Sequence, residues 1–493
     1  MVVARLSHGQ LTVIDRLREM VRLAAGLDQN KRLDAASQAR ALDCLARFGQ
    51  RIRDMHADQV RVVGTNTLRQ ARNSGEFLQA AEQSLGHPVQ VISGIEEARL
   101  IYLGAVHGLP AVAGPQICID IGGGSTELAR GQGLEPELLE SLYLGCVSVS
   151  REFFAGGKLS RRRFDDARLA ARMELAPLRE RFLDRPIARF IGTSGTIRAA
   201  GRVVRALLGE QAGLDREGVE ALIDRMLAAG RVERLQLPGL SEQRRPVFAG
   251  GVAILAAVLE ALDADGLVLA DGALREGILY DLVGRLSDED ARLRSVRALA
   301  GRMRVDAAQA ERVATTALAL FDQVAADWAL EDPELRRLLG WAAQLHEIGL
   351  DIAHAHYHRH GAYLLEHADL PGFTRQEQQL LALLVGSHRR SFDRKAFAVL
   401  GGRRRRQGLR LAVLLRLAVL LNRSRRGRVA LPLRLVARGN VLRLLAPADW
   451  LAANPLTAAD LGKEARRLAD GAGLALQIEP SGADAGQLGE LRQ

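Results

Sequence analysis

An acidic residue, three glycines and a hydroxyl residue follow a short apolar strand, and this order constrains the fold more than any other feature. Residues 117–120 have the pattern of a buried strand, and residues 120–127 read Asp-Ile-Gly-Gly-Gly-Ser-Thr-Glu. Glycines let the backbone approach a phosphate and turn its amides toward the oxygens. Asp120 can hold Mg²⁺, directly or through water, and Ser125 can donate to a phosphate oxygen. Three glycines alone would also fit a flexible turn, but the full order predicts a phosphate site.

A second loop of similar character follows a strand pattern at residues 189–191. It reads Gly-Thr-Ser-Gly-Thr over residues 192–196 and precedes a helix. Taken alone, it would fit a tight turn equally well. Two such loops on successive α/β units indicate two related subdomains that face each other across a cleft.

Two further stretches carry groups suited to phosphate chemistry. Glu96 and Glu97 open a helix after residues 93–94, where acidic side chains commonly do no more than favour the helix dipole. A carboxylate beside a phosphate cleft can also orient or deprotonate water. Arg69 has a planar fork suited to phosphate, and its alternative interpretation is one surface arginine among many.

The remaining pattern divides the chain into an α/β half of roughly 280 residues, a helical region and a small mixed region. Residues 2–16 predict a β-hairpin, followed by two helices that end near Met55. From about Leu286 to Leu421 the pattern is almost wholly helical. Other strands are expected at residues 60–63, 89–93, 429–436, 441–445 and 474–478, and other helices at residues 75–85, 96–107 and 458–472.

The net charge of +10 reflects an uneven distribution of arginine. Twelve arginines and no acidic residue lie between residues 401 and 440. This block suggests a polyanionic partner, namely nucleic acid, acidic lipid or polyphosphate, and its alternative interpretation is a solvated surface. The apolar stretch 409–421 is too short to span a membrane. Three cysteines without metal-binding spacing fit a cytoplasmic protein, and contact with an acidic membrane surface stays open.

Together these motifs resemble the exopolyphosphatase / guanosine pentaphosphate phosphatase family of the actin-like ATPase and sugar-kinase superfamily. The resemblance implies an α/β fold of two actin-like subdomains, an all-helical HD-like domain and a small α+β C-terminal domain. Their expected ranges are 1–102, 103–284, 285–428 and 429–493. The matching stretches cover nearly the whole chain and are residues 64–71, 93–101, 120–127, 145–148, 192–196, 271–277, 345–349 and 387–389.

The resemblance also implies roles for individual residues. Glu97 matches the catalytic glutamate, the base for water, and Arg69 matches the phosphate-contacting arginine. Asp120 and Glu127 match the acidic residues around Mg²⁺ and the attacking water. The phosphate-binding residues are Gly122, Gly123, Gly124 and Ser125 in the first loop and Gly192, Thr193, Ser194 and Gly195 in the second.

The N-terminus departs from the family pattern. Family members begin with a strand and a phosphate loop of the form Asp-Leu-Gly-Ser-Asn-Ser, whereas this sequence starts at the following strand, residues 2–5. The absent strand would lie inside the first sheet, so unpaired ladder groups and an open core are expected. A start codon assigned too far downstream would explain the difference.

The expected function is Mg²⁺-dependent, processive removal of terminal phosphate from inorganic polyphosphate by a cytoplasmic homodimer, with no specific nucleic-acid partner. One alternative is a guanosine pentaphosphate 5′-phosphohydrolase. Another is a non-catalytic polyanion-binding protein, if the N-terminus is truly truncated. A kinase of the same superfamily is disfavoured, because Glu97 and the family motifs point to water as the acceptor.

A separate alternative concerns the histidines, seven of which lie between His346 and His388. They would suit an HD-type metal phosphohydrolase site. The usual pattern has His-Asp, whereas His346 is followed by Glu347, and this favours a degenerate, structural domain.

Overall fold

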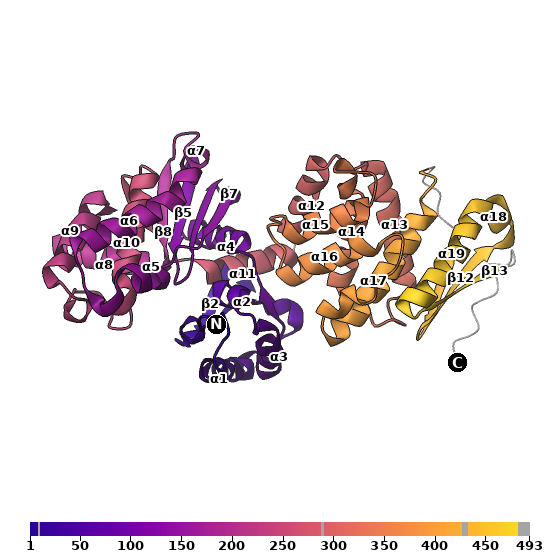
Figure 1. The fold of residues 1–493 in the computed structure, drawn as a ribbon, viewed down its shortest axis with the longest axis horizontal. Helices are drawn as coiled ribbons and strands as arrows, with labels where there is room; N and C mark the ends of the chain where they lie inside the picture. Colours follow the sequence, from indigo (N-terminus) through magenta and orange to yellow (C-terminus); the bar gives the residue numbers. More distant parts are fainter. Residues whose placement is uncertain (8–9, 287–289, 426–431, 482–493) are drawn as a thin grey trace. The chain divides into compact units, whose positions relative to one another are not determined.

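The structure is a computed structural model that describes residues 1–7, 10–286, 290–425 and 432–481. The chain forms two compact units, an N-terminal unit of residues 1–291 and a C-terminal unit of residues 292–493. Figure 1 shows helices with a mixed sheet in the first unit and mainly helices in the second. In the described part of the chain, no helix is long and apolar enough to cross a membrane.

The first part of the N-terminal unit contains two separate pairs of strands, the antiparallel pair β1–β2 and the parallel pair β3–β4. The prediction of two helices before Met55 is wrong, because one short 3₁₀ turn and one α-helix form there. Lys31 has a left-handed φ of 58°, and Asp34 caps the helix by accepting from the Ser37 amide at 2.6 Å, so the helix begins only after residue 34. The elements are β1 (Val2–Ser7), β2 (Gln10–Arg16), η1 (Leu23–Gly26), α1 (Ala35–Ile52), η2 (Ala57–Gln59), β3 (Val62–Gly64), α2 (Asn66–Gln70), α3 (Ser74–Leu85), β4 (Val89–Val91) and α4 (Gly94–His107).

A six-stranded sheet of order β7-β6-β5-β8-β10-β9 forms the centre of the N-terminal unit. Successive side chains of β5 point to opposite faces. Ile117 and Ile119 pack against the core of helices α5 to α10, whereas Cys118 packs against α4. The elements are β5 (Pro115–Ile121), β6 (Thr126–Gln132), β7 (Glu135–Leu142), α5 (Cys146–Phe153), η3 (Ala155–Gly157), α6 (Arg161–Leu175), η4 (Ala176–Leu178), α7 (Arg179–Phe182), β8 (Arg189–Thr193), α8 (Ser194–Leu208), β9 (Leu214–Asp215), α9 (Arg216–Ala229), η5 (Val232–Arg234), α10 (Arg245–Ala261), β10 (Gly266–Leu269) and α11 (Leu274–Leu286).

Helix α4 is held closely against α11. A Cβ added at Gly104 would lie 2.0 Å from the Ala273 carbonyl oxygen, so only glycine allows this approach. Beside this contact, Arg99 Nε donates to Glu96 Oε2 at 2.7 Å, and the same arginine pairs with Asp281 of α11. These contacts fix the position of α4, which also carries Glu97.

The C-terminal unit is a helical bundle followed by the three-stranded sheet β11-β12-β13, in which β11 is antiparallel and β13 parallel to β12. In its described residues the helical prediction for 286–421 is confirmed. The predicted strand 429–436 begins outside the described residues, and the observed strand starts at Arg434. The elements are α12 (Ala291–Arg302), α13 (Ala307–Val324), α14 (Pro333–Leu345), η6 (Ile348–Asp351), α15 (Tyr357–His367), α16 (Arg375–Ser387), η7 (Ala396–Val399), α17 (Gly402–Leu421), β11 (Arg434–Arg438), β12 (Val441–Pro447), α18 (Ala448–Ala453), α19 (Pro455–Ala472) and β13 (Ala475–Ser481).

The arginine block is partly internal to the C-terminal unit. Arg416 of α17 is 2% exposed, and its Nε donates to Glu464 Oε1 of α19 at 2.5 Å. Residues 403–406 instead lie in the first turn of α17, where most of them are exposed. Arginines 426 and 428 lie outside the described residues. The interpretation of the whole block as a polyanion surface is therefore wrong for Arg416, because its guanidinium is buried against a carboxylate.

Candidate active site

Three carboxylates from three elements come together on the α4 side of the central sheet. Asp120 lies two residues after Cys118 on β5, so it faces the same side of the sheet. Glu127 of β6 pairs directly with Asp120 in the antiparallel ladder, which places both side chains on one face. Glu97 lies in the first turn of α4. Strand alternation and pairing therefore direct the Asp120 and Glu127 side chains to one face of the sheet, and Glu97 of α4 joins them on that face.

Glu97, Asp120 and Glu127 form an acid cluster. Each of its two glutamates has a hydrogen-bond partner that sets its orientation. Arg69 of α2 donates from Nη1 to Glu97 Oε2 at 2.8 Å and to the Ile92 carbonyl oxygen at 3.1 Å. The Ser141 hydroxyl of β7 donates to Glu127 Oε1 at 3.0 Å. Glu97 is 8% exposed and Glu127 is 2% exposed. Both carboxylates are therefore fixed in position and largely removed from water.

The three carboxylates oppose one another's ionisation. Burial, together with the Glu97 and Asp120 charges, raises the pKa of Glu127 to about 8. Burial and the Glu97 charge, opposed by Arg198, raise the pKa of Asp120 to about 7. Burial raises the pKa of Glu97 as well, against the effect of Arg69. Perturbed carboxylates of this kind are typical of sites that exchange protons or bind cations.

The free energy of unfolding of the N-terminal unit should depend on pH because of these raised pKa values. A carboxyl group whose pKa is higher in the folded state stabilises the fold below its unfolded pKa, and this stability is lost as pH rises through the folded value. We expect the free energy of unfolding of the N-terminal unit in metal-free buffer to fall between about pH 5 and pH 8 by on the order of 3 kcal/mol. Tryptophan fluorescence does not report on this unit, because all three tryptophans lie in the C-terminal unit. Circular dichroism is therefore the measurement that follows its unfolding.

Two variants provide the controls for this pH experiment. Glu127→Gln should flatten the pH dependence, because it removes a carboxyl group whose pKa is raised to about 8. Glu174→Gln, on the exposed face of α6, should leave the dependence unchanged. A slope that is the same in native protein and Glu127→Gln would contradict the expected effect.

The first glycine loop is shaped by the start of α5. The Gly122 amide donates to the Ser125 carbonyl oxygen at 2.9 Å, which closes the turn. The amides of Cys146 and Val147 donate to the carbonyl oxygens of Gly122 and Gly123, both at 2.9 Å. The start of α5 therefore holds the loop between β5 and β6 in one conformation.

Helix α2 packs against the same loop through Asn66, a residue that the sequence analysis did not select. A Cβ added at Gly124 would lie 2.2 Å from Asn66 Nδ2. Gln70 Nε2 donates to Asn66 Oδ1 at 2.9 Å, which orients the Asn66 amide. Asn66 lies inside the stretch 64–71 that resembles the family, so its position in that motif was the available signal.

The second glycine loop lies beside the acid cluster because β8 pairs with β5. Their parallel register places Thr193 next to Asp120. Ser194 has a φ of +79°, an unusual value for a residue other than glycine. Its hydroxyl accepts from the amides of Thr196 and Ile197, both at 3.2 Å, which caps the start of α8. The two predicted phosphate loops are therefore neighbours at the carboxyl ends of β5 and β8.

Three histidines of the histidine-rich stretch, His346, His358 and His388, form a buried cluster in the C-terminal unit. The ring of His388 lies 5.5 Å from that of His346 and 6.1 Å from that of His358, between centroids. Burial lowers the pKa of His346 and of His358 to about 4, so both rings are neutral near pH 7. Glu347 pairs with Arg425. Across the described residues of both units, no group of three or more His, Cys, Asp or Glu side chains is arranged to hold a metal.

Comparison with known proteins agrees with this architecture. The chain matches the model of the Ppx/GppA phosphatase family over residues 2–286 and that of Ppx/GppA phosphatase, domain III, over residues 291–465. An exopolyphosphatase structure from Cytophaga hutchinsonii is similar, with a TM-score of 0.52 and 22% identity over 57% of this chain and 94% of that chain. The predicted fold class, actin-like α/β followed by a helical domain, is confirmed.

Two relatives match nearly the whole chain, and both are named guanosine-5′-triphosphate,3′-diphosphate pyrophosphatase. The protein from Vibrio cholerae is 38% identical over 97% of this chain and 95% of its own length. The protein from Aeromonas hydrophila is 39% identical over 95% of this chain and 94% of its own length. With both family models matched along the sequence, the chain belongs to the Ppx/GppA phosphatase family.

Proposed function

We propose that this chain hydrolyses the terminal 5′-phosphate of guanosine pentaphosphate, the 5′-triphosphate,3′-diphosphate of guanosine. The observation that carries the reaction class is the acid cluster of Glu97, Asp120 and Glu127 beside two glycine loops, with both glutamates buried. The names of the relatives that match nearly the whole chain support this nucleotide as the substrate. These names favour guanosine pentaphosphate over inorganic polyphosphate, which is the substrate that the sequence motifs alone favour.

Glu97 is the proposed base for the attacking water. Its Oε2 is held by Arg69 at 2.8 Å, so the carboxylate keeps one orientation. The raised pKa of Glu97 makes it a better proton acceptor for water. The water oxygen bonds to the terminal phosphorus while the bond from phosphorus to the bridging oxygen breaks. The leaving nucleotide keeps that oxygen, and the proton taken by Glu97 passes to the products or to solvent.

The two glycine loops are proposed to hold the phosphoryl group that is transferred. Backbone amides and hydroxyls beside a strand end can donate to phosphate oxygens without reorganising during the reaction. The proposed donors are the amides of residues 123–124 and 192–195 and the Ser125 hydroxyl, while the Gly122 amide closes the turn by donating to the Ser125 carbonyl oxygen. Phosphoryl transfer of this kind depends mainly on positioning and charge stabilisation.

We also propose that Asp120 and Glu127 hold Mg²⁺. Two directly paired carboxylates with raised pKa values fit a divalent cation, because the cation would relieve their repulsion. Mg²⁺ commonly takes only one or two carboxylates, and waters and substrate phosphates complete its shell. When bound, it would neutralise charge on the terminal phosphoryl group and its neighbour.

Mg²⁺ should raise the unfolding temperature of native protein at pH 8 but not that of Glu127→Gln.

The test is the release of orthophosphate from guanosine pentaphosphate, with long-chain polyphosphate assayed in parallel and Mg²⁺ varied. The nucleotide product should be the tetraphosphate, identified by anion-exchange chromatography, and kcat/KM should be higher for the nucleotide than for polyphosphate. Faster release from polyphosphate would overturn the proposed substrate. Binding of both compounds without hydrolysis at any Mg²⁺ concentration would overturn the catalytic role and support a polyanion-binding protein.

A further inference from the structure

Three side chains lie in one row across neighbouring strands of the central sheet. Asp120 of β5 is directly opposite Glu127 of β6, and Glu127 is directly opposite Ser141 of β7. Directly opposed residues of antiparallel strands direct their side chains to the same face of a sheet. The row therefore continues from the two proposed Mg²⁺ ligands to a serine that the proposed function does not use.

The Ser141 hydroxyl gives the Glu127 carboxylate a defined orientation. It donates to Oε1 of this carboxylate at 3.0 Å. The other oxygen, Oε2, lies beside the first glycine loop, 3.9 Å from the position of a Cβ added at Gly122. With one oxygen held by the serine, the second oxygen is therefore left beside the loop that is proposed to bind phosphate.

Ser141 is itself confined by the start of α4. A Cβ added at Gly94, the first residue of that helix, would lie 2.4 Å from Ser141 Oγ, so only glycine allows this approach. Glu97 follows three residues later on the same helix. The serine hydroxyl therefore lies between a proposed metal ligand and the start of the helix that carries the proposed base.

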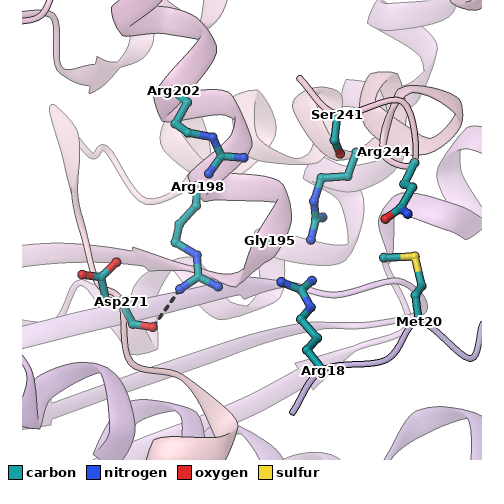
Figure 2. Close-up of a pocket in the computed structure, with 9 residues that line it drawn as sticks. Arg18, Met20, Gly195, Arg198, Arg202, Ser241, Arg244 and Asp271 are labelled. Carbon is teal, nitrogen blue, oxygen red and sulfur yellow. Dashed lines mark hydrogen bonds between the residues drawn. The ribbon is translucent and has the colours of Figure 1, made fainter. Parts of the chain in front are cut away.

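The hydroxyl that holds Glu127 carries no charge, unlike the groups that act on the other two carboxylates. Glu97 is paired with Arg69 at 2.8 Å. The positive charge of Arg198 acts on Asp120, and Figure 2 shows this arginine in an arginine-rich cavity beside the second glycine loop. Among the described residues, no basic side chain is paired with Glu127. A neutral donor therefore orients this carboxylate and leaves its negative charge available to a cation.

We propose that Ser141 is a positioning residue that holds Glu127 in the orientation in which this carboxylate binds Mg²⁺. The inference rests on the proposed function and deepens it, because it gives the proposed metal site a partner beyond its ligands. Removing a group that orients a metal ligand through a hydrogen bond commonly weakens metal binding or activity by about 10- to 100-fold.

The test is the binding of Mn²⁺, which takes oxygen ligands as Mg²⁺ does and whose free form is measured by electron paramagnetic resonance. The measurement is made at pH 8 without nucleotide, so it does not require turnover. Ser141→Ala removes the donor and should raise Kd for Mn²⁺ by about tenfold or more. Ser84→Ala, the same change at another half-buried serine of the N-terminal unit, should keep the native Kd.

A double variant tests whether Ser141 acts through Glu127. Glu127→Gln removes a proposed ligand and should weaken Mn²⁺ binding by itself. In the Glu127→Gln protein, Ser141→Ala should change Kd by less than about twofold, because the carboxylate that the serine orients is gone. If Ser141→Ala raises Kd by the same factor in native and Glu127→Gln proteins, the serine does not act through this glutamate and the inference fails.

Kinetics separates positioning from a general loss of structure. In Ser141→Ala, the Mg²⁺ concentration that gives half-maximal phosphate release should rise by about the same factor as Kd for Mn²⁺. At saturating Mg²⁺, KM for guanosine pentaphosphate should stay at its native value and most of kcat should return. A merely structural defect would instead lower kcat at every Mg²⁺ concentration and lower the unfolding temperature of the metal-free protein.

The outcomes for Ser141 and for the proposed function are distinguishable. An unchanged Kd for Mn²⁺ in Ser141→Ala, or no Mn²⁺ binding by native protein, would overturn the positioning role. Weaker Mn²⁺ binding in Ser141→Ala, together with no release of phosphate from guanosine pentaphosphate by native protein, would contradict the proposed function and leave the positioning role standing.

Discussion

Glu97→Gln should lower kcat for guanosine pentaphosphate by about a thousandfold, within the range typical of a lost general base. The amide cannot accept a proton from water, but it keeps the size of the carboxylate. KM should change little, because Glu97 is proposed to act on the water rather than on the nucleotide. The measurement is steady-state phosphate release, with direct binding of the substrate to the variant as the second readout.

The control for this experiment is Glu174→Gln, the same chemical change on the exposed face of α6, which should retain native kcat. Circular dichroism should show that the Glu97→Gln variant is folded, because the amide keeps the size of the carboxylate and Arg69 keeps its contact with the Ile92 carbonyl oxygen at 3.1 Å. Near-native kcat in a folded Glu97→Gln protein would contradict the role of Glu97. A loss of binding without a change in kcat would assign this residue to the substrate instead.

The second large effect concerns the stability of the C-terminal unit. Glu464→Gln should lower its free energy of unfolding by about 3 kcal/mol, because Arg416 would remain buried without a counter-charge. Glu464 holds both Nε and Nη2 of Arg416, at 2.5 and 3.1 Å. Tryptophan fluorescence in urea measures this unit alone, since Trp328, Trp341 and Trp450 all lie in it.

Two further variants separate the buried charge from other effects. The double variant Arg416→Met/Glu464→Leu should recover most of the lost stability, because an apolar pair of similar size needs no desolvation of charge. Glu479→Gln, in the exposed pair with Arg443 on neighbouring strands, should leave the urea midpoint nearly unchanged. If Glu464→Gln and Glu479→Gln unfold at the same urea concentration, the buried pair does not stabilise this unit.

The amino-acid sequence alone was enough to find both glycine loops and most helices. The requirements at residues 120–127 and 192–196 are local: a strand end, glycines for close approach, and a hydroxyl residue. The helical character of residues 291–421 also follows from apolar spacing within each segment. Strands β6 and β7 were missed because polar residues hide the apolar pattern, such as Glu127 and Arg130 in β6 and Glu137 and Glu140 in β7.

Tertiary structure alone decided what the charged side chains do. Ser141 binds Glu127 only because β7 pairs beside β6, and no local pattern marked that serine. Arg416 and Arg198 are both arginines on helices, yet the first is neutralised by a buried glutamate and the second lines an arginine-rich cavity. The physical reason is that burial and pairing of a charge depend on segments far away in the sequence, whereas backbone conformation depends largely on neighbouring residues.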